Sequence, residues 1–239
     1  MLLIDGKVYE SQELPRILFG PHRPLSYVLN PKAACTLALH FLFYANHNYR
    51  YFDVSRIHFS TTALFRLEGP DLDPGLLDAY FRLAPERFTF VRDPLRRFVS
   101  GFHEKILVGG DPGYLQFRDE LTSLYGVDLS PEANPAQSCL AFAKWLASNV
   151  DLKRFDPHFR PQHVNLMVGS RFTIDTILRL EDRDAVFAFF SKWIGSEKAK
   201  WFLSLKFNVQ TYSIDEYVTD ELKALVRAIY ADDYRIFYA

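Results

Sequence analysis

The sequence predicts an α/β protein, a three-layer sandwich in which a central parallel sheet is covered by helices on both faces. Short apolar segments of strand character alternate along the chain with apolar segments of helical length, and this alternation is typical of parallel sheets. Hydrophobic residues make up 49% of the chain, which is enough for a substantial core. The 239 residues contain no internal repeat or long linker, so one domain over 1–239 is expected.

The first quarter of the chain predicts a strand, a tight loop and a helix. Residues 1–22 are rich in turn formers and read as an irregular lead-in. The segment PLSYVL (24–29) predicts a short buried strand, which Asn30-Pro31 interrupts. The apolar stretch 36–46 then has the length of a helix, and a second strand is expected within 51–59.

The middle of the chain contains the clearest buried strand. Residues 74–84 predict a helix, and FTFV (88–91) has the aromatic and β-branched composition of a strand. Asp93-Pro94 suits the start of the helix LRRFVSGFHEKIL, because proline is well placed at a first helical position. An amphipathic helix is expected over 135–149.

The C-terminal third adds one strand and two helices, at 174–180, 182–194 and 219–230. In parallel sheets covered by helices, ligands bind beyond the carboxyl ends of the strands. The loops 30–36 and 92–100 both follow predicted strands. We therefore expect them at the same edge of the sheet.

Charge and composition exclude several classes of protein. The net charge of −1 argues against a nucleic-acid partner, so any anion site must be a local basic cluster. Cys35 and Cys139 are the two cysteines, too few for a disulfide framework. No signal peptide is visible, and the longest apolar run, 41–45, is far too short for a transmembrane segment. A cytoplasmic protein is the expectation.

The loop after the first strand has the composition of an anion site. Its small residues let backbone N–H groups approach a phosphate, and the following helix adds the positive end of its dipole. Lys32 adds a mobile cation, and Thr36 is expected to supply a hydroxyl at the cap position. The segment is not a Walker A motif, because its glycines are absent. Taken alone, the segment is better interpreted as an ordinary helix start with an exposed lysine.

The loop after the strand 88–91 carries a second set of anion-binding groups. Arg92 ends the strand, and Ser100 lies about two helical turns further on. The planar guanidinium suits a phosphate monoester, and a serine hydroxyl can donate to the same group. The alternative role expected for Arg92 is a salt bridge to a neighbouring carboxylate. Arg96 and Arg97 are expected on a solvated helix face.

These residues resemble the two cofactor signatures of the sulfotransferase superfamily: PKAACT after one strand, then FTFVRDPLRRFVSGF. The resemblance is closest to the carbohydrate branch that acts on chondroitin, dermatan and related glycans, with its bacterial relatives. DPHFRPQH (156–163), IDTILRLED and the ending YADDYRIFY are also similar to segments of that family. The chain has neither the membrane anchor nor the disulfide cysteines of the eukaryotic enzymes, which favours a soluble bacterial-type form.

The resemblance implies a P-loop-like sulfotransferase fold and a donor, 3′-phosphoadenosine 5′-phosphosulfate (PAPS), which leaves as adenosine 3′,5′-bisphosphate. The acceptor would be a hydroxyl of a saccharide or glycolipid, and no metal is implied. Arg92 and Ser100 would hold the 3′-phosphate. Around the sulfuryl end, the resemblance implies a binding segment made of Pro31, Lys32, Ala33, Ala34, Cys35 and Thr36.

The reaction needs a base, and neutral imidazole suits that role near pH 7. His58 is the first candidate, because relatives place a histidine between their cofactor motifs, and His158 is its rival. Glu104 is a carboxylate alternative. A P-loop-type kinase using ATP and a non-catalytic module that binds nucleotide or sulfated glycan remain as alternative functions.

Overall fold

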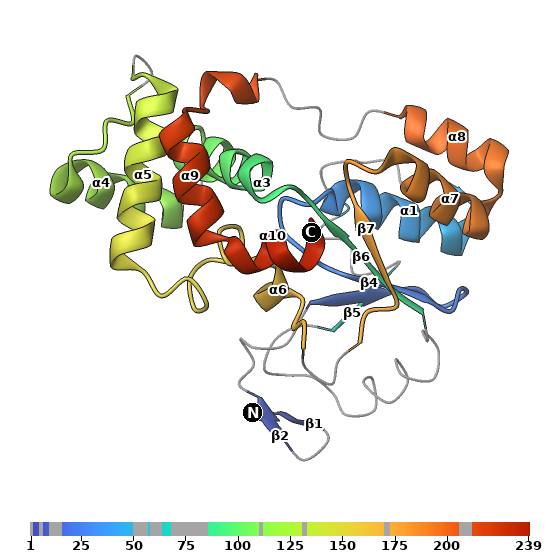
Figure 1. The fold of residues 1–239 in the computed structure, drawn as a ribbon. Helices are drawn as coiled ribbons and strands as arrows, with labels where there is room; N and C mark the ends of the chain where they lie inside the picture. The colour runs from blue at the N-terminus through green and yellow to red at the C-terminus, as the bar shows by residue number, and fades with distance from the viewer. Residues whose placement is uncertain are drawn as a thin grey trace. The chain divides into compact units, whose positions relative to one another are not determined.

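The structure is a computed structural model, and it describes most of the chain (Figure 1). The described residues are 2–4, 7–9, 16–49, 57, 64–67, 86–109, 112–130, 133–169, 173–205 and 212–239. Apart from Ile57, the strand expected within 51–59 and the helix expected over 74–84 lie outside them.

The chain divides into two compact units, and each is discontinuous in sequence. Unit 1 comprises Met1–Val91 and Gln162–Val209, and unit 2 comprises Arg92–Pro161 and Gln210–Ala239. The expectation of one domain over 1–239 stays a prediction.

A five-stranded sheet forms the centre of unit 1, with the order β5-β3-β4-β6-β7. The strands are β3 (Ile17–Phe19), β4 (Leu25–Val28), β5 (Phe65–Leu67), β6 (Glu86–Val91) and β7 (Thr176–Arg179). Strands β4, β6 and β7 are parallel, with Tyr27 opposite Phe88 and Phe90 opposite Leu178. This confirms the α/β class and the parallel core predicted from the sequence.

The sheet is mixed rather than wholly parallel, because β3 pairs antiparallel with both β4 and β5. The expected irregular lead-in over 1–22 is therefore wrong. It contains β3 and also a hairpin of β1 (Leu2–Ile4) and β2 (Lys7–Tyr9). Strands of three residues are too short to show an alternating pattern, which is why they read as loop.

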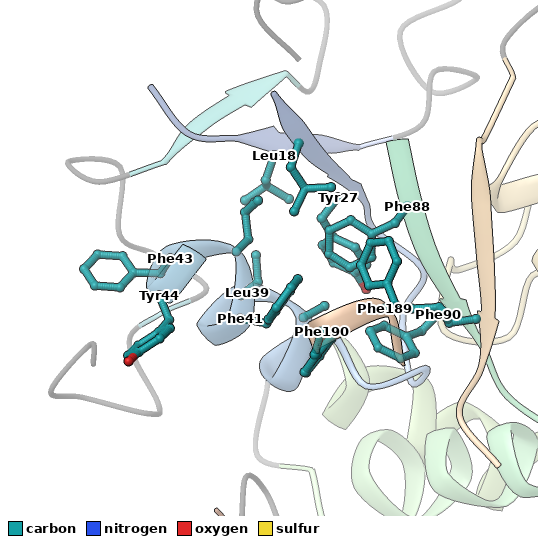
Figure 2. Close-up of a cluster of buried hydrophobic side chains, with 14 of the residues drawn as sticks. Leu18, Tyr27, Leu39, Phe41, Phe43, Tyr44, Phe88, Phe90, Phe189 and Phe190 are labelled. Carbon is teal, nitrogen blue, oxygen red and sulfur yellow. The ribbon is translucent and has the colours of Figure 1, made fainter. Parts of the chain in front are cut away.

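Helices α1 (Cys35–His47) and α7 (Arg183–Ile194) pack against the sheet of unit 1, and α8 (Ser196–Ser204) packs on α7. Phe41 of α1 stacks on Phe190 of α7 with 3.7 Å between ring centroids, and both belong to the buried cluster that includes Phe88 and Phe90 of β6 (Figure 2). Helices α1 and α7 therefore share one core over one face of the sheet. Strand side chains that point to the other face of the sheet, such as Val28, are buried too.

Unit 2 is helical and has its own aromatic core. Its elements are α3 (Pro94–Gly101), the π-helix η2 (Phe102–Leu107), α4 (Pro112–Tyr125), α5 (Pro135–Asn149), η3 (Ile214–Glu216), α9 (Asp220–Ile229) and α10 (Ala231–Phe237). Phe98, Phe102, Phe142 and Phe159 are fully buried at its centre. The short α6 (Gln162–Asn165) belongs to unit 1.

No helix in the described ranges combines the length and the apolar character needed to cross a bilayer. Cys35 and Cys139 are both free thiols.

Candidate active site

Asn30 fixes the start of the loop that follows β4. Its side-chain amide donates to the Phe90 carbonyl at 3.0 Å and to Gln162 Oε1 at 2.9 Å. Its carbonyl accepts from the Ala33 N–H at 3.2 Å and from Cys35 Sγ at 3.0 Å. Asn30 is fully buried, so these bonds hold the loop in a water-excluded position beside the end of β6.

The backbone of this loop alternates in handedness. Lys32 has φ 63° and Ala34 has φ 60° and ψ 31°, both left-handed, whereas Ala33 between them does not have a positive φ. Left-handed residues in such turns help backbone N–H groups converge on an anion, and in this loop the Ala33 N–H already donates to the Asn30 carbonyl. The sequence predicted an anion loop here, but not these dihedral angles.

Helix α1 begins without a capping side chain. Its N-cap is Ala34, which has no side-chain acceptor for the N–H groups of the first turn. Four other helices have an N-cap residue whose side chain accepts such a bond: Asp93 for α3, Asn134 for α5, Asp182 for α7 and Thr219 for α9. The positive end of the α1 dipole is thus left to be satisfied by another acceptor, for which an anion is suited.

Thr36 does not cap α1, and that expectation is wrong. The left-handed Ala34 ends the loop two residues earlier, so Thr36 lies inside the first turn and is buried. The role of Pro31 to Thr36 in binding the sulfuryl end stays a prediction. Lys32 and Cys35 are half-buried.

Tyr27, on β4, contacts the loop through its side-chain hydroxyl. Its hydroxyl donates to Cys35 Sγ at 3.4 Å, and that sulfur in turn contacts the Asn30 carbonyl. Burial and the neighbouring Cys35 raise the pKa of Tyr27 well above its usual value, so the phenol stays protonated and acts as a donor.

Arg92 and Ser100, the second predicted pair, both act on Tyr212 in unit 2, Ser100 through a hydrogen bond and Arg92 through its charge. Burial raises the pKa of Tyr212, against the lowering effects of a hydrogen bond with Ser100 and of the Arg92 charge. His103 stacks on Tyr212 with 3.8 Å between ring centroids, and His103 Nδ1 lies 2.6 Å from the Tyr217 hydroxyl. Arg92 and Ser100 therefore both influence one tyrosine, which the sequence did not single out.

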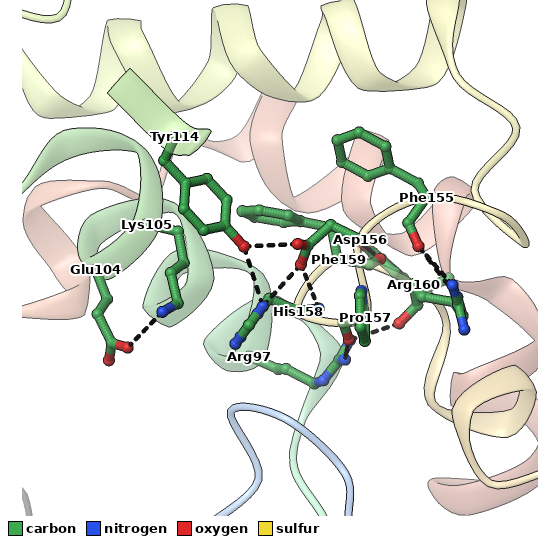
Figure 3. A network of polar contacts seen from close by, with 11 residues as sticks. Arg97, Glu104, Lys105, Tyr114, Phe155, Asp156, Pro157, His158, Phe159 and Arg160 are labelled. Carbon is green, nitrogen blue, oxygen red and sulfur yellow. Dashed lines mark hydrogen bonds and ion pairs between the residues drawn. The ribbon is translucent and has the colours of Figure 1, made fainter. Parts of the chain in front are cut away.

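Arg97 is buried, so the expectation of a solvated helix face is wrong for it. Its guanidinium donates to the carbonyls of Pro157 at 2.8 Å and Arg160 at 2.9 Å (Figure 3). The Tyr230 hydroxyl donates to the Phe159 carbonyl at 2.6 Å. These three hydrogen bonds hold the loop 156–161 in place. Arg96 is exposed, as expected.

His158 lies in this loop beside two oxygen groups (Figure 3). Its Nδ1 is 2.7 Å from Asp156 Oδ1 and 3.2 Å from the Tyr114 hydroxyl, which donates to Asp156 Oδ2 at 2.6 Å. Burial alone would raise the pKa of Asp156, but the contacts with His158 and Tyr114 lower it to about 2. The ionised carboxylate therefore stabilises the fold above pH 4, and this contribution is lost as the pH falls through about 2.

His58 lies outside the described residues, so its role as a base stays a prediction. Among the described residues, no group of three or more His, Cys, Asp or Glu side chains could hold a metal ion.

A family model described as the sulfotransferase family matches residues 15–239, nearly the whole chain. The chain belongs to the sulfotransferase family. No curated protein and no solved structure gives a match. The matched range contains the loop 30–36, Arg92, Ser100 and the His158 loop, so every candidate site residue of this sulfotransferase-family chain falls inside it. Family membership supports a transferase activity.

The sequence did not reveal Tyr212, Asp156 or Tyr114 as members of the site. Tyr212 and Tyr114 are separated from Ser100 and His158 by many residues, and a single sequence carries no signal for such contacts. Asp156 could have been predicted from the sequence, because an Asp side chain often accepts the backbone N–H of the residue two positions later, here His158.

Proposed function

We propose that this sulfotransferase-family chain transfers the sulfuryl group of PAPS to a hydroxyl of a saccharide or glycolipid. The observation that carries the proposal is the alternating backbone of Lys32 to Ala34 at the uncapped start of α1. In a sulfotransferase-family chain, this arrangement fits a phosphosulfate.

Bound PAPS would supply the sulfuryl group, with its 5′-phosphate oxygen as the leaving atom when the acceptor oxygen attacks sulfur in line. Negative charge then grows on that phosphate oxygen. The Lys32 ammonium and the loop N–H groups would stabilise this charge without rearranging, which is where preorganised donors act most strongly. Their role is to bind, orient and neutralise.

The 3′-phosphate of the donor would be held by Arg92 and Ser100. Tyr212 supports this assignment, because its hydroxyl is hydrogen-bonded with Ser100 and is under the influence of the Arg92 charge. Such a set of donors suits a phosphate monoester better than a single salt bridge would.

A histidine would take the proton of the acceptor hydroxyl as the oxygen–sulfur bond forms. His58 and His158 remain the two candidates for this base. A general base of this kind contributes typically 10²- to 10⁴-fold.

Ligand-dependent melting tests the donor assignment. Adenosine 3′,5′-bisphosphate at about a hundred times its Kd should raise the melting temperature by roughly 5–10 °C. Adenosine 5′-monophosphate should raise it less, and ATP should not raise it. Stabilisation by ATP alone would contradict the proposal and favour a kinase.

Transfer of radiolabelled sulfuryl from PAPS to a panel of saccharides and glycolipids tests the reaction itself. We expect label on at least one hydroxyl acceptor. Binding of adenosine 3′,5′-bisphosphate without transfer to any member of the panel would instead indicate a non-catalytic module.

A further inference from the structure

The contacts of His158 fix which of its ring nitrogens carries a proton. Asp156 has its pKa lowered to about 2, so it is a carboxylate at neutral pH and can only accept hydrogen bonds. At 2.7 Å from Asp156 Oδ1, the Nδ1 of neutral His158 must therefore be the protonated nitrogen. Its Nε2 then holds the free lone pair, which is the tautomer that a general base needs.

Tyr114 completes the support of this carboxylate from helix α4. Its hydroxyl donates to Asp156 Oδ2 at 2.6 Å while lying 3.2 Å from His158 Nδ1. One oxygen of Asp156 is thus occupied by Tyr114, which leaves the other to hold the imidazole. Within the described residues, Nε2 has no hydrogen-bond partner, and 27% of the His158 side chain is exposed.

The charged groups around this cluster come from three elements. Asp156 is on the loop itself, and Arg97 of α3 reaches the Pro157 carbonyl. Lys105 of η2 lies 5.5 Å from the centre of the Tyr114 ring and pairs with Glu104 at 3.6 Å. Asp156 is the carboxylate in direct contact with the imidazole, so its replacement tests the role of this pair most directly.

We propose that His158 is the catalytic base of the sulfuryl transfer and that Asp156 and Tyr114 are its positioning residues. The proposal rests on the proposed function. The acceptor O–H proton moves to His158 Nε2 as the oxygen–sulfur bond forms, and Asp156 stabilises the imidazolium that results, as a carboxylate does when it orients a catalytic histidine.

Asp156 also has a structural role, which the test must separate. Its Oδ1 accepts the His158 backbone N–H at 2.7 Å, so it closes a side-chain turn. Asp156→Asn keeps an oxygen acceptor for that turn but removes the charge. Asp128→Asn is a matched control, because Asp128 closes the same kind of turn on the Ser130 N–H at 3.0 Å.

The first experiment measures kcat against pH for sulfuryl transfer from PAPS. Asp156→Asn should lower kcat by about 10- to 100-fold and move the acidic limb of the profile to lower pH by about one unit. The KM for PAPS should stay unchanged. Tyr114→Phe should give a smaller effect in the same direction, and Asp128→Asn none. An unmoved acidic limb in Asp156→Asn would overturn the positioning role.

The second experiment needs no activity. Imidazole ¹⁵N spectra of the resting protein, assigned with His158→Gln, should show His158 protonated at Nδ1 near pH 8. Asp156→Asn should shift the tautomer toward protonation at Nε2. If the wild type transfers no sulfuryl group but shows this tautomer, the proposed function fails and the hydrogen-bond assignment stands. If transfer occurs and His158→Gln remains fully active, the base assignment is wrong.

Discussion

Lys32 and Ala34 hold a left-handed backbone, which costs a residue with a β-carbon roughly 1–2 kcal/mol. Asn30 makes this conformation persist, because its four hydrogen bonds fix the loop at its first residue. Strain of this kind is retained where the conformation serves a site. Here two residues with a β-carbon hold the left-handed φ that glycines readily adopt in glycine-rich phosphate loops.

Lys32→Ala should reduce the turnover of PAPS by about 10²-fold or more, by analogy with the loss of one oxyanion-type donor. Binding of adenosine 3′,5′-bisphosphate should weaken less, because the leaving-group charge exists mainly in the transition state. Lys32→Gly should lose the same activity yet melt at a higher temperature than Lys32→Ala, since glycine adopts the left-handed φ without strain. Steady-state kinetics with calorimetric melting checks both. Near-wild-type turnover in either variant would contradict the role of Lys32.

Arg92→Ala should discriminate between two nucleotides. If Arg92 contacts the 3′-phosphate, affinity for adenosine 3′,5′-bisphosphate should fall about ten- to a hundred-fold, as expected for a charged hydrogen bond. Affinity for adenosine 5′-monophosphate should hardly change. Titration calorimetry measures both, with the exposed Arg96→Ala as the matched control. Equal losses for the two nucleotides would remove the 3′-phosphate role.

At the scale of elements, the sequence predicted those helices and strands whose bounds depend on residues near them in the chain. Helix α5 spans 135–149 as predicted, because Asn134 caps it and Pro135 occupies its first turn. Strand β6 and the start of α3 follow from FTFV and Asp93-Pro94 in the same way. What depends on distant partners was missed: the antiparallel β3, whose pairing is set by neighbouring strands, and the burial of Arg97, whose acceptors lie some 60 residues away.

Helix α3 and the loop 156–161 pack closely against each other. A β-carbon at Gly101 would lie 3.0 Å from Phe159 Cε1 and 3.5 Å from the His158 carbonyl. The glycine that follows Ser100 therefore allows a close approach between the helix that carries Ser100 and the loop that carries His158. Arg97 adds two hydrogen bonds across the same interface.

Arg97→Met should destabilise the protein by roughly 2–4 kcal/mol, because two hydrogen bonds from a buried charged donor are lost. The adjacent Arg96→Met removes a charge from the same helix at an exposed position, and it should change stability by less than about 0.5 kcal/mol. Urea unfolding of the two variants measures the difference. Equal stabilities would mean that Arg97 is not an anchor of the loop.

At the scale of the whole molecule, the chain passes three times between its two units, after Val91, Pro161 and Val209. The parallel pair β6 and β7 brings together two segments of unit 1 that unit 2 separates in sequence. In unit 2, α5 and α9 likewise come from separate segments and pack together. To fold, each unit must bring together segments that a stretch of the other unit separates in sequence. Folding of that stretch shortens the loop that has to be closed, so the folding of the two units is coupled.

This interleaving predicts one cooperative unfolding transition rather than two. Phe41→Leu in the core of unit 1 and Phe142→Leu in the core of unit 2 each alter a fully buried ring and should cost roughly 1–2 kcal/mol. Because a coupled chain unfolds as a whole, both variants should shift the same calorimetric peak, by roughly 2–8 °C for a protein of this size. The calorimetric and van't Hoff enthalpies of the wild type should also agree. Two peaks, one moved by Phe41→Leu and the other by Phe142→Leu, would show that the units are independent domains and that the single-domain prediction is wrong.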